Sequence, residues 1–438
     1  MIYGGDGLAR LPADDRGPGK AAFVPLVLAG EEVDASLTEE KPGYVRARAE
    51  SILRASPHRV KPQCRYFSSC GGCQYQHASY DHQLDIKKEI LRESLRRFAK
   101  LELQCEIEMH PSPPWNYRNR SRLQVRVQPE FATGYFKLGS HELMAVEACP
   151  ISSPLINRGI SALWQSGRGG KVAEGVCEVE FFANADDTKL LVEIYCAREA
   201  RRAAVRTWAE ELRAALPEIV GVAAFRAPQA GGGGAAQERL ISLGEQSLIY
   251  RTQLGSYRVS VGAFFQTNRF LTDELVKIVA QGRQGELALD LYAGVGLFST
   301  ALARDFHHVV AVESSQLSTG DLAYNLSSKG ESIQASTEQY LSRREKPGRA
   351  GNGRAFPDNV HRLDLVVADP PRSGLGGRVA RMLANLGSPR LTYVSCDPAT
   401  LARDLVLLLA AGYRIEQAHL VDLFPQTYHL ESVLHLVR

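Results

Sequence analysis

The sequence predicts a multidomain protein with a small β domain, a central α+β domain and a C-terminal α/β domain built on a doubly wound, mostly parallel sheet. Its 438 residues are enough for two or three such domains. The start of the chain has the composition of short strands and turns, and strands also dominate its middle. From about residue 264 onward, strand-like and helix-like runs alternate, which is the pattern of a parallel sheet covered by helices.

The first domain, residues 1–55, is predicted from two runs of β-type composition. These runs cover 21–33 and 44–53, and the pair Pro42-Gly43 marks a turn between them. A small five-stranded barrel of the OB kind fits this pattern, and many other small β domains fit it equally well.

The central domain, residues 56–260, is predicted to begin with one clear helix over 79–99. Apolar residues recur there at helical spacing, and basic residues such as Lys87 occupy the rest of its surface. We therefore expect a docked apolar face and a solvated basic face. Mostly strand-like segments follow, and then the α/β domain of residues 261–438, in which 346–359 form a surface insertion.

Composition argues against some classes of protein. Hydrophobic residues make up 44% and charged residues 23% of the chain, as in ordinary soluble proteins. No apolar run approaches the roughly 18 residues that a membrane span needs. The start of the chain lacks the apolar segment of a signal peptide, so we expect a cytoplasmic protein whose eight cysteines form no disulfides.

The distribution of charge permits a nucleic-acid-binding face. The net charge is only +3, so the whole molecule is not a polycation. Lys and Arg nevertheless gather in four segments, 46–65, 87–100, 117–126 and 197–206. Such clusters suit contacts with phosphates, and solvated helix faces are the alternative interpretation.

A glycine turn in the C-terminal domain predicts a cofactor site. The segment 288–303 has the pattern of a strand, a turn containing Gly294 and Gly296, and a helix, and the next strand ends in Glu313. Glycines let the backbone approach a ligand closely, and an acid at the tip of the second strand suits the hydroxyls of a ribose. Together with DPPRSG (369–374) at a third strand end, the set points to S-adenosylmethionine rather than a nicotinamide.

Cys396 has the features of a nucleophile. It follows an apolar strand-like run and precedes a helix start, where Asp397 suits the N-cap and Pro398 the first helical position. The positive end of a helix dipole favours the thiolate form of a nearby cysteine. A small buried hydrophobe is the alternative interpretation. Arg372 stands where methyltransferases that modify amino groups commonly have an aromatic residue, which argues for a different target atom.

Methylation of uracil C5 needs a thiolate, a base and a methyl donor together. That carbon is a poor nucleophile until a thiolate adds to C6, and a base must later remove the C5 proton so that the thiolate can leave. Glu431 lies among apolar residues near the C-terminus, where partial desolvation raises a carboxyl pKa toward the range of a general base. An edge-strand charge is the alternative interpretation of Glu431.

Five segments resemble the RNA uracil-C5 methyltransferases, in the same order. They are FFQTNRF (264–270), LDLYAGVGLFS (289–299), VVADPPRSG (366–374), YVSCDPATLARD (393–404) and DLFPQTYHLESV (422–433). The resemblance extends through the cysteine region and the N-terminal β segment, so it covers nearly the whole chain. It implies a Rossmann-like methyltransferase domain at 261–438 and a TRAM domain, an OB-like RNA-binding barrel, at 1–55. The TRAM domain of the family usually starts several residues earlier than this chain does.

The resemblance also implies roles for single residues. Cys396 would be the nucleophile, and Glu431 would be the base that removes the C5 proton. Asp369 would sit between the cofactor and the target base, and the target uridine would leave its stack to enter the pocket. The residues that would bind S-adenosylmethionine are Gln266, Tyr292, Gly294, Glu313 and Asp369.

Four cysteines have the spacing of a metal site. Cys64, Cys70 and Cys73 lie within ten residues, and Cys149 is the fourth candidate. Spacing alone leaves a tetrahedral zinc ion and a [4Fe–4S] cluster both open. The resemblance favours the [4Fe–4S] cluster, because the ribosomal RNA branch of the family carries one at this spacing. We expect it to join the 79–99 helix and the central β domain into one RNA-binding wall.

The preferred prediction is methylation of C5 of a specific uridine in 23S ribosomal RNA by a monomer without a membrane partner. Bacterial relatives that act on transfer RNA generally lack the TRAM domain and the cluster cysteines, but archaeal ones have both, so a transfer RNA substrate stays open. An RNA cytosine-C5 methyltransferase is less favoured, because such enzymes usually place the nucleophile in another motif. A non-catalytic RNA-binding protein is disfavoured by the intact set of Cys396, Glu431, Asp369 and Glu313.

Overall fold

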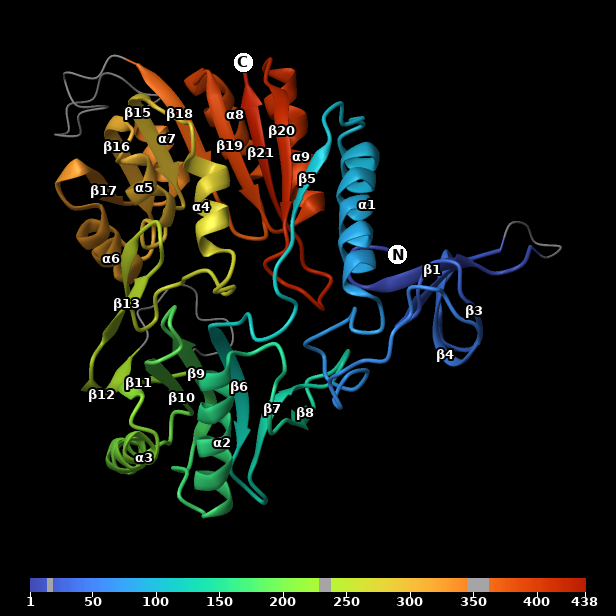
Figure 1. Ribbon diagram of the computed structural model, residues 1–438, viewed down its shortest axis with the longest axis vertical. Helices are drawn as coiled ribbons and strands as arrows, with labels where there is room; N and C mark the ends of the chain where they lie inside the picture. The colour runs from blue at the N-terminus through green and yellow to red at the C-terminus, as the bar shows by residue number, and fades with distance from the viewer. Residues whose placement is uncertain (14–18, 228–237, 345–361) are drawn as a thin grey trace.

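The computed structural model describes residues 1–13, 19–227, 238–344 and 362–438, so the insertion expected at 346–359 lies outside the described residues. Figure 1 shows a strand-rich N-terminal part at one side, a central sheet with helices below, and a large helix-covered sheet above. None of the helices in these described ranges is long and apolar enough to cross a membrane.

The N-terminal part is a four-stranded sheet in the order β1-β2-β4-β3. The long strand β4 (Tyr44–Arg54) pairs with β2 (Ala21–Pro25) and with β3 (Glu32–Glu40), and β1 (Asp6–Arg10) pairs with β2. The described residues of this part thus contain one strand fewer than the five-stranded barrel that the sequence suggested. The small core of the sheet consists of Val24, Val27 and Ala47.

Helix α1 (Tyr80–Phe98) forms where the sequence predicted a basic amphipathic helix. It packs against helix α9 (Pro398–Ala410), and its residue Leu91 belongs to a core of the large sheet. The prediction that Lys87 lies on a solvated face was wrong. Its side chain is fully buried and pairs with Asp422 at 2.6 Å, so the charge is compensated inside the protein.

The central part is a seven-stranded sheet in the order β12-β11-β10-β9-β6-β7-β8, covered by two helices. Its strands pair antiparallel except for the parallel pair β10 and β11. The elements are β6 (Arg120–Arg126), β7 (Ala132–Phe136), β8 (Leu143–Ala145), α2 (Pro154–Arg168), β9 (Val176–Ala183), β10 (Leu190–Cys196), α3 (Arg202–Ala215), β11 (Ile219–Arg226) and β12 (Arg239–Gly244).

The C-terminal part is an eight-stranded sheet in the order β17-β16-β15-β18-β19-β21-β20-β5. Its strands are β15 (Gly285–Leu291), β16 (Phe306–Glu313), β17 (Gly330–Gln334), β18 (Leu363–Ala368), β19 (Arg390–Ser395), β20 (Arg414–Val421), β21 (Glu431–Val437) and β5 (Ile107–His110). The strands from β17 to β19 are parallel to one another, as the alternating pattern predicted, and β21 runs antiparallel to both of its neighbours.

Helices cover both faces of this large sheet. One face packs against α4 (Thr272–Ala280), α5 (Leu297–Leu302) and α6 (Gln316–Leu326). The other face packs against α7 (Thr337–Arg344), α8 (Gly376–Leu386), α9 and α1. The carboxyl ends of β15, β16, β18 and β19 therefore meet at one edge between two helical layers, where ligands of such sheets bind.

Two segments that the sequence placed in the central domain belong to the C-terminal part: one is a strand of the large sheet, and the other packs on its core. Strand β5 pairs in parallel with β20, and its residue Ile107 joins the core beneath α1. The hairpin β13 (Ser247–Arg251) and β14 (Ser256–Ser260) packs on the core of the opposite face. A strand as short as β5 carries too few residues for its pairing partner to be predicted from local pattern.

Candidate active site

Cys396 lies at the carboxyl end of β19, directly before helix α9. The side chain of Asp397 caps this helix by accepting hydrogen bonds from the amides of Ala399 and Thr400, at 3.0 and 2.9 Å. Pro398 occupies the first turn, as predicted. These contacts fix the turn and hold Cys396, half-buried, at the ligand-binding edge of the sheet.

Glu431 comes from a distant part of the chain to the same place. Strand β21 pairs Ser432 with Ser395 on β19, so Glu431 and Cys396 follow as neighbours at the strand ends. Glu431 is only 5% exposed. Asp369, which follows the adjacent strand β18, lies close enough to affect the ionisation of both. The structure thus brings one thiol and two carboxyl groups together.

The ionisation of Cys396 differs from the sequence expectation. Burial raises the pKa of its thiol to about 12, and the neighbouring Glu431 and Asp369 add to the effect, which Arg372 opposes. This shift opposes the thiolate form that the helix start was expected to favour, and its largest cause is the burial of the thiol.

The two carboxyl groups also have raised pKa values. Burial, together with Asp369, holds the pKa of Glu431 well above its usual value, although Arg372 opposes the shift. Burial raises the pKa of Asp369 to about 7, with Asp290 as the second cause. In the free protein the surroundings of the site therefore oppose the charged forms of Glu431, Asp369 and the Cys396 thiol.

Four of the five predicted cofactor residues line one pocket at the carboxyl ends of β15 and β18. They are Gln266, Tyr292, Gly294 and Asp369. Tyr292 and Gly294 have φ angles of 62° and 56°, a conformation that glycine tolerates and that costs other residues roughly 1–3 kcal/mol. A Cβ at Gly294 would meet no atom within 4 Å, so its backbone borders open space.

The fifth predicted residue, Glu313, supports the glycine turn. One carboxylate oxygen accepts a hydrogen bond from the amide of Gly294 at 2.9 Å, and the other accepts one from the amide of Ser315 at 2.6 Å. Glu313 is therefore joined to the pocket through Gly294 rather than being part of its lining.

Sequence reasoning missed two residues of the site. Asp290 is fully buried at the end of β15, where it accepts a hydrogen bond from Ser299 and keeps one oxygen without a partner; burial raises its pKa to about 7. Its position before the glycine turn was a usable signal. Tyr3 donates a hydrogen bond to the carbonyl oxygen of Cys396 at 3.2 Å and packs edge-on against Tyr428 at 5.3 Å. No local pattern indicated this contact.

The four predicted metal-binding cysteines line a second cavity, of about 250 Å³, in the central part. Burial and the neighbouring thiols raise the pKa of Cys73 to about 12, and Cys64 and Cys70 shift in the same direction. The four are Cys64, Cys70, Cys73 and Cys149.

A doubly wound sheet with a glycine turn after its first strand, and with acids at the ends of the two neighbouring strands, defines the methyltransferase class. Comparisons narrow this class. The family model described as tRNA (Uracil-5-)-methyltransferase matches residues 79–438. The chain therefore belongs to the RNA uracil-C5 methyltransferase family and is an RNA methyltransferase, as its motifs predicted.

Relatives match over nearly the whole chain. An uncharacterized RNA methyltransferase of Aquifex aeolicus is 31% identical over 99% of this chain and 96% of its own length. A 23S rRNA (uracil(1939)-C(5))-methyltransferase, RlmD, of Pseudomonas fluorescens is 32% identical over 97% of this chain and 92% of its own length. The crystal structure of Pyrococcus abyssi tRNA (uracil-54, C5)-methyltransferase with S-adenosyl-L-homocysteine has a TM-score of 0.72, is 24% identical, and covers 99% and 100% of the two chains; it shares the fold.

Proposed function

We propose that the protein transfers a methyl group from S-adenosylmethionine to C5 of a uridine in 23S ribosomal RNA, through a covalent adduct between Cys396 and uracil C6. The observation that carries this proposal is the meeting of Cys396 and Glu431 on neighbouring strand ends, beside the pocket of Gly294 and Asp369. A thiol and a carboxyl group in contact with a methyl donor are what C5 methylation needs.

The residues present fit S-adenosylmethionine. The open space beside Gly294 lets the backbone approach a ligand, and the unpartnered oxygen of Asp290 is an acceptor that awaits a donor. Gln266, Tyr292 and Asp369 would hold the ligand in this pocket. Glu313 lies outside the lining and binds the Gly294 amide, so its contact with the ribose stays a prediction. When bound, the cofactor supplies a methyl group on a cationic sulfur.

The side chains of this site divide the reaction between them. The thiolate of Cys396 adds to C6 of the extruded uracil, which leaves an electron pair on C5 to take the methyl group. Glu431, as the carboxylate, then accepts the C5 proton, and the C6–sulfur bond breaks to restore the uracil and the free cysteine. Burial gives Glu431 a high affinity for protons, which suits a carboxylate that must accept one from carbon.

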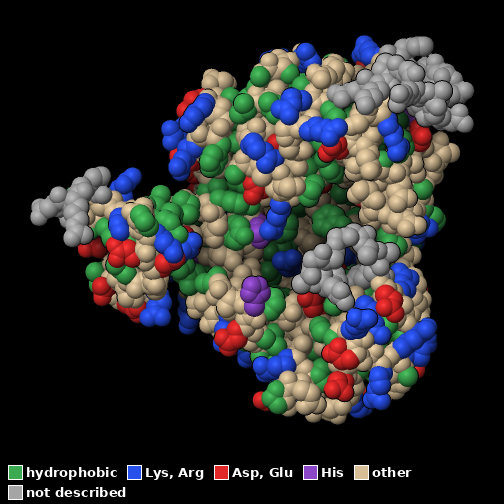
Figure 2. Space-filling view, turned by 180° about the vertical axis from the view of Figure 1, so that it is seen from behind, with side chains coloured by type: hydrophobic (Ala, Val, Ile, Leu, Met, Phe, Trp, Pro, Cys, Tyr) green, Lys and Arg blue, Asp and Glu red, His purple; other side chains and the backbone are tan. Residues whose placement is uncertain are grey.

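Ribosomal RNA is the favoured substrate because two relatives, each 32% identical with at least 90% of both chains covered, are named as 23S ribosomal RNA methyltransferases. Transfer RNA is the second candidate, since the matching family model and the solved structure with the same fold are named for it. Figure 2 shows a hollow between the upper and lower parts, with Lys and Arg side chains on both, which suits a bound polyanion.

We further propose that residues 1–55 act as a TRAM-type RNA-binding domain.

We also propose that Cys64, Cys70, Cys73 and Cys149 hold a [4Fe–4S] cluster. A zinc ion with bonds of about 2.3 Å would need all four sulfur atoms within roughly 3.8 Å of one another. The cavity that the four cysteines line measures about 250 Å³, which leaves room for a group larger than a single ion. The cluster would be structural, holding the cysteine segment against the central sheet.

The cluster is tested by measuring the iron and acid-labile sulfide content of the anaerobically purified protein. About four of each per chain are expected, and Cys73→Ser should lose both. Stoichiometric zinc without iron in the wild-type protein would contradict the assignment.

The substrate is tested by mass spectrometry of RNA from a strain that lacks this protein. One 5-methyluridine should disappear from 23S ribosomal RNA and return when the wild-type gene, but not Cys396→Ala, is restored. Loss of 5-methyluridine from transfer RNA alone would contradict the ribosomal assignment and identify transfer RNA as the substrate.

A further inference from the structure

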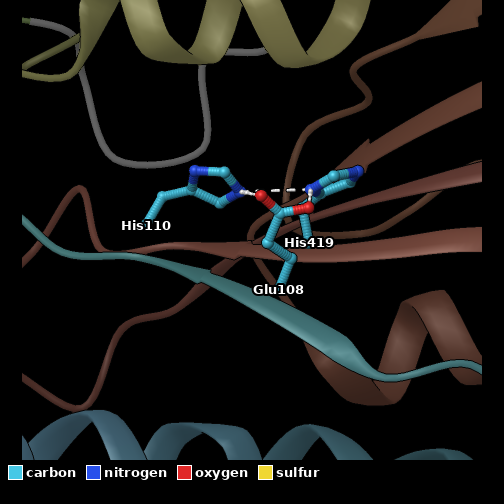
Figure 3. Close-up of side chains that lie close together, drawn as sticks. All are labelled: Glu108, His110 and His419. Carbon is cyan, nitrogen blue, oxygen red and sulfur yellow. Dashed lines mark hydrogen bonds and ion pairs between the residues drawn. The ribbon is translucent and has the colours of Figure 1, made fainter.

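A cluster of titratable side chains lies at the outer edge of the large sheet, outside the active site. The parallel register of β5 and β20 sets Glu108 opposite His419, and His110 follows two residues later on the same face as Glu108. Figure 3 shows the three side chains pointing toward one another, with the carboxylate between the two imidazole rings. Two paired strands thus fix the cluster.

The three facing atoms have the spacing of metal ligands. Nε2 of His110 lies 3.1 Å from Nδ1 of His419. The Glu108 carboxylate lies 3.4 Å from the same nitrogen of His419 and 3.9 Å from Nε2 of His110. A tetrahedral zinc ion with bonds of about 2.0–2.1 Å sets neighbouring ligand atoms roughly 3.3–3.4 Å apart. The three distances differ from this spacing by about 0.6 Å at most, and a different carboxylate oxygen of Glu108 faces each ring.

The orientation of His110 also suits a ligand. Its Nδ1 lies 3.0 Å from a carboxylate oxygen of Glu274 on helix α4, so Nδ1 donates its proton there and Nε2 keeps a lone pair toward the cluster. Metal-binding histidines usually donate their second ring N–H to a carboxylate in this way.

A hydrogen bond between His110 and His419 alone accounts for the arrangement less well than a bound ion does. With the His110 proton committed to Glu274, the two facing nitrogens and the Glu108 carboxylate have at most the one Nδ1 proton of His419 between them. A cation would satisfy all three acceptors. The side chain of Glu108 is 67% exposed, so an ion can enter from solvent and can keep a water molecule as a further ligand.

We propose that Glu108, His110 and His419 bind one divalent transition-metal ion of the zinc class, in a site separate from the cysteine cavity. The donor set of two imidazoles and one carboxylate suits zinc. The ion links β5 to β20 and, through Glu274, to helix α4. It therefore fastens the edge strand that leads from helix α1 into the central part.

Zinc uptake by the full-length protein tests this site. Protein treated with a chelator is dialysed against micromolar Zn²⁺, and bound zinc is counted for the wild type, Glu108→Gln and His419→Gln. The control is His307→Gln, which breaks the exposed pair of His307 and Glu286 at 3.7 Å. The wild type and His307→Gln should each bind one zinc ion more than Glu108→Gln and His419→Gln. Zinc bound in the cysteine cavity cancels in this comparison, because the cavity is the same in all four proteins.

Equal zinc content in all four proteins would overturn the proposal. Glu108→Gln changes an exposed side chain and keeps its shape, so it provides the comparison even where His419→Gln fails to fold. Glu274→Gln removes no ligand and should weaken zinc binding about 10–100-fold, because it loosens the orientation of His110. Unchanged affinity in Glu274→Gln would contradict the role assigned to that residue. Zn²⁺ should also raise the melting temperature of the wild type but not that of Glu108→Gln.

Discussion

At Cys396, burial and one cation have opposite effects on the thiol. Burial, Glu431 and Asp369 raise its pKa to about 12, while Arg372 lowers it. In the free protein the proposed nucleophile is therefore mainly in the thiol form near neutral pH. Bound RNA must change these surroundings before the thiolate can form.

Alkylation of Cys396 measures this state. In the free protein its reaction with iodoacetamide should rise about tenfold per pH unit above pH 7, because only the thiolate reacts. Arg372→Gln should raise the pKa further and slow the reaction at each pH below about 12. The exposed Arg381→Gln on helix α8 is the control. The rate is followed by mass spectrometry of the peptide that contains Cys396, and a plateau near pH 8 would show that the thiol is already ionised there.

The buried acids of the site should make stability fall with pH. Burial raises the pKa of Asp290 and of Asp369 from 3.8 to about 7. The neutral forms are favoured in the folded state, so their contribution is complete below about pH 4 and is lost as pH rises through about 7.

Asp290→Asn removes one of these titrations. Its free energy of unfolding, relative to the wild type, should increase between pH 4 and pH 8 by up to a few kcal/mol, at about 1.4 kcal/mol per pKa unit. Urea unfolding across this range measures the difference, with the exposed Asp305→Asn as control. A difference that is constant with pH would rule out a raised pKa for Asp290.

At the scale of elements, the start of helix α9 positions Cys396, the proposed nucleophile. Asp397→Ala removes the side chain that accepts from the amides of Ala399 and Thr400, and should cost about 1 kcal/mol of unfolding free energy. Asp397→Asn keeps an acceptor and should recover most of this loss. Urea unfolding measures both variants, and equal losses in both would mean that the cap is not the source.

Helix α1 holds the segment that leads into Glu431. The buried ammonium of Lys87 donates to Asp422 at 2.6 Å and to the carbonyl oxygen of Phe424 at 2.9 Å, and the hydroxyl of Tyr80 donates to Asp422 at 2.9 Å. This network connects the early helix to the chain between β20 and β21. Helix α1 therefore supports the segment before Glu431, the proposed base, as well as the hydrophobic core.

Lys87→Met should leave Asp422 buried without its partner and lower the free energy of unfolding by about 3–5 kcal/mol. The matched control is Lys88→Met, whose ion pair with Glu106 at 3.2 Å involves a largely exposed carboxylate; that change should cost less than about 1 kcal/mol. Chemical unfolding of both variants gives the comparison. Similar losses would contradict a special role for the buried pair.

For the whole molecule, local pattern predicted the alternating C-terminal fold and the nature of its site. The strand-end positions of Asp369, Glu313 and Cys396 could be predicted from the sequence, because parallel strands bring their carboxyl ends to one edge of the sheet. Contacts between distant segments were not readable, as with strand β5 on the large sheet or Tyr3 at Cys396. They depend on packing between parts, which no periodicity within one segment encodes. The raised pKa of the thiol was not predicted for the same reason, since its burial depends on the fold and its charged neighbours come from the start of β21 and from the segment after β18.

The proposed mechanism requires a covalent bond between Cys396 and RNA, and it requires Glu431 for that bond to break. The most direct measurement is a denaturing gel of Glu431→Gln incubated with S-adenosylmethionine and a 23S ribosomal RNA fragment. We predict a protein–RNA adduct that survives denaturation and disappears in the double variant Cys396→Ala/Glu431→Gln. Absence of the adduct in Glu431→Gln, or its persistence without Cys396, would contradict the proposed mechanism.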